Sequence, residues 1–307
     1  MNEKVSVLQV DNLSVSFSMY NKGLSKRDLE VIHELSIEVK KGEIVAVVGS
    51  SGSGKSLLAH AIMGILPENS KTKGSIKYYN DELNEKYLRK VRGKDIAFIP
   101  QSVDFLDPLM KVGKQVVGIN GNKERQKEVF KKYNLDDKVA EMYPFQLSGG
   151  MARRVLIATA VMNEAKLIIA DEPTPGLNLE LAMETLNNFR EIADSGCGVL
   201  LITHDVDLAL NVADRIAVFY SGTIVEIAQV EDFIKGKDAL RHPYSKAFID
   251  ALPQNKFKEL PGYQPYAGNL PKGCLFRDRC SLKTDECCME IKMRKVRDGE
   301  VRCINAT

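Results

Sequence analysis

The chain has 307 residues, of which 44% are hydrophobic and 27% are charged, as in a soluble protein with a packed core. Its 43 basic and 41 acidic residues nearly cancel, so no overall field indicates a nucleic-acid partner. No apolar run approaches the roughly 18 residues that cross a bilayer, and the first residues lack the pattern of a signal peptide. We therefore expect a chain that stays in the cytosol and meets a membrane only through partner subunits.

The first forty residues contain two alternating segments, 8–17 and 31–39, on either side of a polar insert. Alternation of apolar and polar residues is typical of strands with one buried face, so this region predicts a small antiparallel sheet. Phe17 lies in the first segment, where an aromatic side chain commonly belongs to the core.

The rest of the chain to about residue 235 alternates between short apolar runs and helical stretches. The runs are rich in β-branched residues and cover 44–48, 96–99, 167–170, 199–202 and 216–219. Such runs are typical of buried parallel strands joined by crossover helices. Between residues 181 and 195, helical spacing places Ala182, Leu186, Phe189 and Ala193 on one face, with Ile192 beside it, as in a helix that covers a sheet. The sequence therefore predicts an α/β fold with a mostly parallel core sheet.

A glycine-rich loop follows the first of these runs and precedes a helical stretch. It fits the pattern G-x-x-x-x-G-K-S and consists of Gly49, Ser50, Ser51, Gly52, Ser53, Gly54, Lys55 and Ser56, followed by Leu57. In this setting backbone amides surround phosphate oxygens, the lysine reaches the outer phosphates and the serine binds magnesium. The strand before the loop and the helix after it favour this phosphate-binding loop (P-loop) over a flexible linker.

Two carboxylates end the hydrophobic run at 167–170. We expect Asp171 to reach the magnesium shell and Glu172 to face the terminal phosphate, where a carboxylate can polarise a water molecule. An acidic turn after a core strand is the alternative, and the P-loop makes it the weaker one.

Three further elements separate this chain from a generic P-loop protein: Gln101 after the run at 96–99, the segment Leu147–Met151 (LSGGM), and His204 after the run at 199–202. Serine and two glycines alone would only cap a helix. The order and spacing of all these motifs, however, resemble the ABC ATPase family throughout residues 8–235. The resemblance implies a P-loop NTPase fold with an antiparallel β subdomain and a helical subdomain at about 104–163.

The resemblance also implies roles for the motif residues. ATP and Mg²⁺ are the ligands, with Ser56, Asp171 and Gln101 at the metal and Phe17 stacked on adenine. Glu172, Gln101 and His204 act in hydrolysis, and Gln101 also senses the membrane subunit. The segment Ser148, Gly149 and Gly150 binds the γ-phosphate of ATP held by a second ABC ATPase subunit, so a lone chain should hydrolyse ATP poorly. The family usually pairs two different paralogues, and the sequence does not distinguish an identical partner from a related one.

Residue 178 departs from the family pattern, which usually has aspartate there. Asn178 keeps the hydrogen-bonding capacity and loses the charge. We expect altered communication between the two ATP sites of the assembled pair.

The composition changes near residue 235, because five of the eleven prolines lie between residues 243 and 271 and a cysteine cluster follows. We place a domain boundary there, with the ATPase domain at 1–235 and an extension at 236–307. The segments His242–Ser245, Ala251–Pro253 and Gly273–Cys280, and also the stretch 92–115 and Tyr143–Met151, resemble the dipeptide, oligopeptide and nickel importer group. That group implies two permease subunits, an external solute-binding protein and a place on the cytoplasmic face of the membrane.

The extension contains Cys274, Cys280, Cys287, Cys288 and Cys303. Cytosolic thiols are normally reduced, so this cluster favours a metal site over disulfide bonds. Some members of the resembling group carry an iron–sulfur cluster here. Four thiolates suit either a [4Fe–4S] cluster or zinc, and the spacing lacks the C-x-x-C pairs of zinc ribbons, so reduced free cysteines stay an alternative.

Two rival functions are considered. A soluble ABC ATPase of DNA repair or ribosomes would carry coiled-coil insertions or a second cassette, and a P-loop small-molecule kinase would leave the LSGG segment and His204 unexplained. The sequence does not distinguish peptide, nickel and metal-chelate cargo.

Overall fold

The computed structural model describes residues 5–20, 25–118, 121–252, 255 and 257–307, in which two sheets form the frame of the molecule. The smaller sheet is antiparallel, in the order β2-β1-β4-β5. Its long strands are β1 (Ser6–Tyr20) and β2 (Lys26–Lys40), joined by β4 (Ser70–Tyr78) and the short β5 (Asp81–Glu82). The antiparallel pairing expected from the alternating segments is confirmed, and β4 and β5 are additional to it.

The larger sheet has the order β11-β12-β10-β9-β3-β8-β7-β6. Its parallel part consists of β3 (Ile44–Val48), β6 (Ile96–Ile99), β7 (Leu167–Asp171), β8 (Gly198–Thr203) and β9 (Arg215–Tyr220). These strands match the five apolar runs, and their parallel pairing confirms the predicted core sheet. Strands that are buried on both faces lose the alternation of polar residues, which explains why they are continuous apolar runs.

The two faces of this sheet belong to different cores. Along β3, Ile44, Ala46 and Val48 pack into a core with the helices, whereas Val45 and Val47 pack into a core with the antiparallel sheet and α1 (Lys55–Met63). Side chains of a strand alternate between its faces, so one five-residue segment anchors both layers. The strand that leads into the P-loop is therefore held from both sides.

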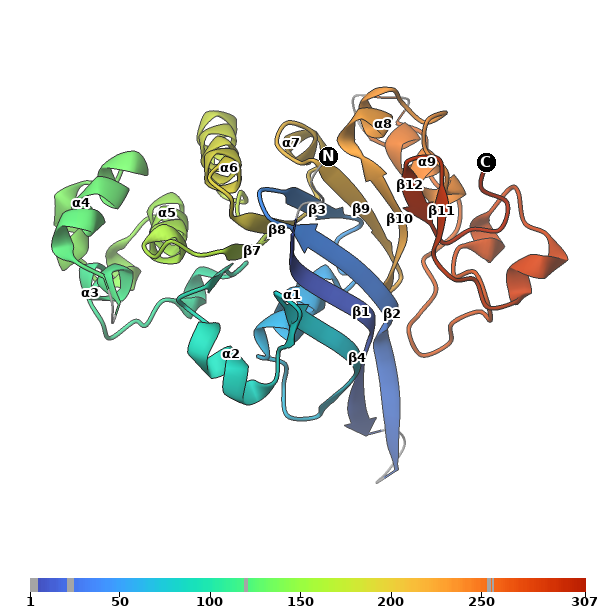
Figure 1. Ribbon diagram of the computed structural model, residues 1–307, viewed down its shortest axis with the longest axis horizontal. Coiled ribbons are helices and arrows are strands. Elements are labelled where there is room, and N and C mark those ends of the chain that lie inside the picture. The colour runs from blue at the N-terminus through green and yellow to red at the C-terminus, as the bar shows by residue number, and fades with distance from the viewer. Residues whose placement is uncertain (1–4, 21–24, 119–120, 253–254, 256) are drawn as a thin grey trace.

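Helices make up one end of the molecule (Figure 1). These are α3 (Val112–Val117), α4 (Lys123–Lys132) and α5 (Gly149–Val161), with short 3-10 turns at Val103–Phe105, Asp137–Glu141 and Pro144–Gln146. The helix α2 (Glu85–Val91) precedes β6, while α6 (Leu179–Asp194) and α7 (Val206–Leu210) flank β8. Within α6, Ala182, Leu186, Phe189 and Ala193 are buried, as helical spacing predicts.

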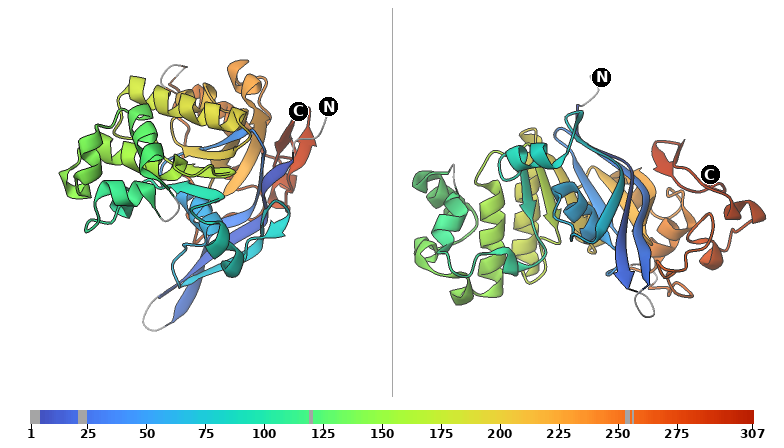
Figure 2. Two further views of the ribbon diagram at one scale, coloured as in Figure 1. Left: turned by 60° about the vertical axis from the view of Figure 1, so that its left-hand side comes forward. Right: turned by 90° about the horizontal axis from the view of Figure 1, so that it is seen from below.

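The extension continues the core sheet at its opposite end (Figures 1 and 2). After β10 (Thr223–Gln229), the chain forms α8 (Val230–Ile234), α9 (Pro243–Asp250) and 3-10 turns at Arg277–Arg279 and Asp285–Cys288. It then returns as β11 (Arg294–Val296) and β12 (Gly299–Val301), and β12 pairs with β10. The extension is thus hydrogen-bonded into the same sheet as the P-loop strand. Pro253, which the sequence comparison used, lies outside the described residues.

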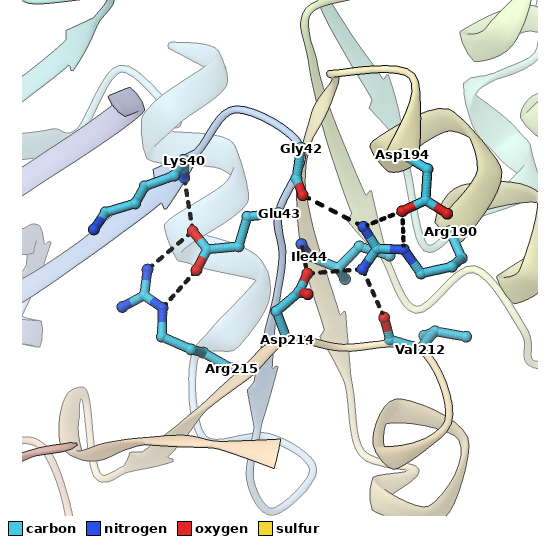
Figure 3. A network of polar contacts seen from close by, with 9 residues as sticks. All are labelled: Lys40, Gly42, Glu43, Ile44, Arg190, Asp194, Val212, Asp214 and Arg215. Atoms are coloured by element: carbon cyan, nitrogen blue, oxygen red, sulfur yellow. Dashed lines mark hydrogen bonds and ion pairs between the residues drawn. The ribbon is translucent and has the colours of Figure 1, made fainter. Parts of the chain in front are cut away.

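A polar network fixes the base of β3 (Figure 3). Asp214 accepts hydrogen bonds from the Ile44 amide and from Arg190 Nη1, both at 2.7 Å. Arg215 donates to Glu43 Oε1 at 2.7 Å, and the other oxygen of Glu43 accepts from the Lys40 amide at 2.8 Å. These contacts join β3, β9 and α6 at the start of β3. They therefore fix the strand that leads into the P-loop.

No helix of the described residues has the length and apolar character needed to cross a membrane.

Candidate nucleotide-binding site

The loop from Gly49 to Ser56 joins β3 to α1. A Cβ on Gly49 would lie 2.5 Å from the carbonyl oxygen of Phe219, so only glycine allows the loop to leave the sheet this closely. Gly54 has φ +103° and caps α1, a conformation that favours glycine. The loop therefore turns its backbone toward the helix N-terminus, where amide groups and the helix dipole favour an anion.

Lys55 lies folded back over this loop. Its ammonium group donates to the carbonyl oxygens of Gly49 and Ser50, both at 2.8 Å, and the residue is 5% exposed. Burial lowers the pKa of Lys55, while the carboxylates of Glu172 and Asp171 act in the opposite direction. In the same loop, Ser53 Oγ is buried without a hydrogen-bond partner among the described residues. An orphaned hydroxyl beside a buried cation fits a loop built to hold phosphate oxygens.

Asp171 ends β7 next to the start of α1. Ser56 Oγ donates to Asp171 Oδ1 at 3.1 Å, so two of the three expected magnesium ligands already lie in contact. Burial raises the pKa of Asp171, and the charge of Glu172 adds to this, whereas the hydrogen bond from Ser56 and the charges of His60 and Lys55 lower it. A hydroxyl and a carboxylate are oxygen ligands of the kind that Mg²⁺ prefers, so this pair fits the metal.

Glu172 and His204 form the second contact of the site. His204 Nδ1 lies 2.9 Å from both carboxylate oxygens of Glu172. Glu172 is 6% exposed and has φ +48°, a left-handed conformation that costs a non-glycine residue free energy. Its amide donates to the Ile202 carbonyl at 2.9 Å, which holds this backbone in place. The neighbouring strand thus fixes the strained backbone of Glu172, and His204 fixes its carboxylate.

Gln101 follows β6 and is exposed, and its backbone is held by an arginine that the sequence analysis missed. Arg153 of α5 donates from Nη1 to the Pro100 carbonyl at 2.8 Å and from Nη2 to the Gln101 carbonyl at 2.5 Å. Arg153 is 6% exposed, and burial lowers its pKa against the opposing charges of Asp171 and Glu172. Only its position two residues after the LSGGM segment could have drawn attention to it.

The segment Ser148–Gly150 opens α5. Ser148 Oγ accepts a hydrogen bond from the Met151 amide at 3.3 Å, and a Cβ on Gly150 would approach the Gly176 carbonyl at 3.8 Å. Helix α5 belongs to the helical end of the molecule, whereas α1 lies under the middle of the sheets (Figure 1). Within one chain, the N-terminus of α5 thus lies apart from the P-loop.

Phe17 lies on the antiparallel sheet, and the extension contacts the P-loop. Phe17 is half-buried on β1, pairs with Leu29 and packs against the core that contains α1. From the extension, Gln264 Oε1 accepts a hydrogen bond from Ser50 Oγ of the P-loop at 3.1 Å. Nothing in the sequence pattern indicated that the proline-rich segment would reach the P-loop.

The cysteines of the extension separate into a group of four and one outlier. Burial raises the pKa of Cys274 to about 11, with smaller contributions from Cys303, Cys287 and Cys280, so these four thiols lie close enough to act on one another. Cys288 is exposed and accepts a hydrogen bond from Arg277 Nη1 at 3.1 Å. No three His, Cys, Asp or Glu side chains in the described part of the chain are arranged as ligands of one metal ion. The expected zinc or cluster site is therefore not seen as a formed metal centre.

Comparisons with known proteins agree with this geometry. A family model described as "ABC transporter" matches residues 32–175, and one described as "Oligopeptide/dipeptide transporter, C-terminal region" matches residues 225–287. The dipeptide transport ATP-binding protein DppD of Haemophilus influenzae is 32% identical and aligns with 97% of this chain and 95% of its own. The oligopeptide transport ATP-binding protein OppD of Bacillus subtilis is 34% identical, with 90% and 81% covered.

Among solved structures, a dimeric bacterial ABC transporter cassette aligns with a TM-score of 0.65 and 26% identity, over 73% of this chain and 98% of that one. The same cassette in a post-hydrolysis state, with ADP and phosphate bound, gives a TM-score of 0.64 and 25% identity. These matches confirm the P-loop NTPase fold. The chain belongs to the ABC ATPases, in the family of ATP-binding proteins of dipeptide and oligopeptide transporters.

Proposed function

We propose that this chain is the subunit that binds and hydrolyses ATP to power the import of dipeptides or short oligopeptides across the cytoplasmic membrane. The observation that carries the proposal is the match to peptide-transport ATP-binding proteins over nearly the whole chain, including the extension beyond the ATPase motifs. Two permease subunits would hold the chain at the cytoplasmic face, and an external binding protein would deliver the solute. Nickel or metal-chelate import remains the alternative cargo.

The site residues divide the chemistry of hydrolysis among them. Lys55 and the amides of the loop from Gly49 to Leu57 hold the phosphates, and Phe17 stacks on the base. Mg²⁺, held by Ser56, Asp171 and Gln101, neutralises phosphate charge when it is bound. Glu172 orients water and accepts its proton as a general base. His204, at 2.9 Å, holds this carboxylate in position.

A second ATPase subunit completes the site. The helix N-terminus at Ser148–Gly150 lies in the helical end of the molecule, away from its own P-loop, and offers unpaired amides to the γ-phosphate in an opposite chain. ATP would thus close two chains around two nucleotides, and hydrolysis would let them reopen. This motion would switch the permeases between outward-facing and inward-facing states.

An uptake assay tests the proposed cargo. A strain lacking this chain should lose uptake of a labelled dipeptide and regain it with the wild-type chain, while nickel uptake stays unchanged. Loss of nickel uptake alone would make the metal the cargo. A soluble ABC ATPase of DNA repair or ribosomes would change neither and would not co-purify with integral membrane subunits.

For the extension, we propose that Cys274, Cys280, Cys287 and Cys303 hold a [4Fe–4S] cluster. Support comes from Cys280, Cys287 and Cys303, each of which contributes to the raised pKa of Cys274, and from the exposed position of Cys288. Among the described residues, no three of these thiols are arranged as ligands of one metal ion. A cluster suits this better than zinc, because each thiolate binds a different iron atom, whereas zinc draws four ligands to a single centre.

Metal analysis with a matched pair of variants tests the cluster. Protein purified without oxygen should contain iron and acid-labile sulfide. Cys280→Ser should lose both, and Cys288→Ser should keep them. Zinc in place of iron, or the absence of all three, would reject the cluster.

A further inference from the structure

One segment of the extension, residues 260–268, lies against the P-loop, and we call it the bracing segment. Its half-buried Gln264 accepts a hydrogen bond at Oε1 from Ser50 Oγ of the P-loop, at 3.1 Å. The two residues are 214 positions apart in the chain. This hydrogen bond therefore joins the loop expected at the phosphates to a part of the chain that follows all the ATPase motifs.

The bracing segment is itself held in place by side chains that donate to its backbone carbonyls. The donors are Arg279 (to Leu260 at 3.1 Å and to Pro261 at 2.8 Å), Ser221 (to Pro265 at 3.3 Å) and Arg27 (to Gly268 at 2.6 Å). These contacts lie on both sides of Gln264 along the chain, and two of the donors belong to the ATPase domain. A group on a fixed backbone loses little freedom when it forms a hydrogen bond, so Gln264 offers Ser50 a preset acceptor.

A second residue of the extension, Tyr244 of α9, also contacts Ser50. Burial raises the pKa of Tyr244 to about 12, while a side-chain hydrogen bond with Ser50 acts in the opposite direction. Tyr244 is 3% exposed, and its ring centroid lies 4.3 Å from that of Tyr220 at the end of β9. The hydroxyl of Ser50 is thus held between a buried tyrosine and the bracing segment.

Ser50 also contacts the cation of the nucleotide site. Its backbone carbonyl accepts a hydrogen bond from the ammonium group of Lys55 at 2.8 Å, as does the carbonyl of Gly49. The position of Ser50 therefore sets one of the two carbonyls around this ammonium group. Binding of a charged ligand depends on groups that are held close to their productive positions, so a shift of Ser50 weakens the hold on the phosphates.

We propose that Gln264 is a positioning residue of the nucleotide site, which holds Ser50 and with it the P-loop in the conformation that binds ATP, an inference that rests on the proposed function of this loop. The extension thereby contributes to nucleotide affinity. Gln264 acts on the loop and not on the reacting atoms, so its loss weakens the binding of ATP and leaves the rate of the chemical step unchanged.

Calorimetric titration of the full-length chain with ATP and Mg²⁺ tests this role. Gln264→Met removes the acceptor and keeps most of the length of the side chain. Gln229→Met is the matched control, because Gln229 pairs with Arg215 at the end of the sheet opposite the P-loop. The Kd for ATP should be about threefold to tenfold higher in Gln264→Met and unchanged in Gln229→Met. In the assembled complex, Gln264→Met should raise the KM for ATP and leave kcat unchanged.

A double-mutant cycle shows whether Gln264 acts through Ser50. In a Ser50→Ala background the donor is already gone, so Gln264→Met should weaken ATP binding no further. An equal loss of affinity in both backgrounds would show that Gln264 only stabilises the extension, and would overturn the positioning role. The same holds if wild type binds ATP and Gln264→Met binds it equally well. A wild-type chain that binds no ATP would instead reject the proposed function, and the positioning role with it.

Discussion

The guanidinium group of Arg153 donates to the backbone carbonyl of Gln101 across 2.5 Å. Arg153 lies in the first turns of α5, the helix that begins beside Ser148, whereas Gln101 lies in the loop after β6. One buried side chain therefore joins the loop expected at the magnesium and the permease to the helix expected at the opposite ATP. Two hydrogen bonds link the two elements, so we expect a movement of one to affect the other.

Replacement of Arg153 by methionine should uncouple these elements. The carbonyls of Pro100 and Gln101 would lose their donor, which should cost about 1–3 kcal/mol of unfolding free energy. We expect permease-stimulated ATPase activity to fall several-fold more than basal activity, measured in the assembled complex. Arg125→Met, at an exposed pair with Glu128, is the control for loss of an arginine. Equal losses of stimulated and basal activity would contradict the coupling role.

Replacement of Glu172 by glutamine should stop hydrolysis without preventing ATP binding. An amide still accepts a hydrogen bond from His204 but cannot take a proton from water, so turnover should fall about 100-fold or more. Gel filtration with ATP should show the variant trapped as a pair of ATPase subunits. Glu180→Gln, at the exposed start of α6, should behave as wild type. Unchanged turnover in Glu172→Gln would reject the assigned role.

His242 makes stability depend on pH. Burial lowers its pKa from 6.5 to about 3, so below pH 6.5 the unfolded chain binds a proton that the folded chain excludes. Its contribution to stability is therefore present above pH 6.5 and is lost as the pH falls toward 3, by about 1.4 kcal/mol per pH unit.

His242→Asn should remove this loss, because asparagine does not titrate in this pH range. Asparagine can still accept the hydrogen bond from the Tyr244 amide as a helix N-cap, so the local structure should be kept. Between pH 7 and pH 5, urea unfolding should show wild type losing about 2 kcal/mol more than the variant. Parallel losses in the two proteins would show that His242 is protonated in the folded chain.

The variant Asn178→Asp tests whether the departure from the family pattern at this position matters. The Asn178 side chain accepts from the Leu181 amide at 2.9 Å and caps α6. Aspartate caps equally well and adds a favourable charge at the helix N-terminus, so Asn178→Asp should raise stability by about 0.3–1 kcal/mol. We also expect it to change the cooperativity of ATP hydrolysis in the assembled complex. An unaltered rate and cooperativity would show that the departure is silent.

The sequence by itself determined the local parts of this protein. The strands at 44–48 and 96–99 were predictable to the residue, because strands buried on both faces are short apolar runs between helices. The P-loop was predictable because its conformation depends on consecutive residues such as Gly54 and Lys55, and the antiparallel sheet because its alternation is local.

Only the tertiary structure decided which distant residues meet. The strands β10, β11 and β12 were not predicted, and their pairing makes the extension part of the core sheet. The contact of Arg153 with Gln101 and the separation of Cys287 from Cys288 depend on how helices and turns pack. Sequence spacing fixes the geometry of neighbours along the chain, whereas these sites come from long-range packing, which no local pattern encodes.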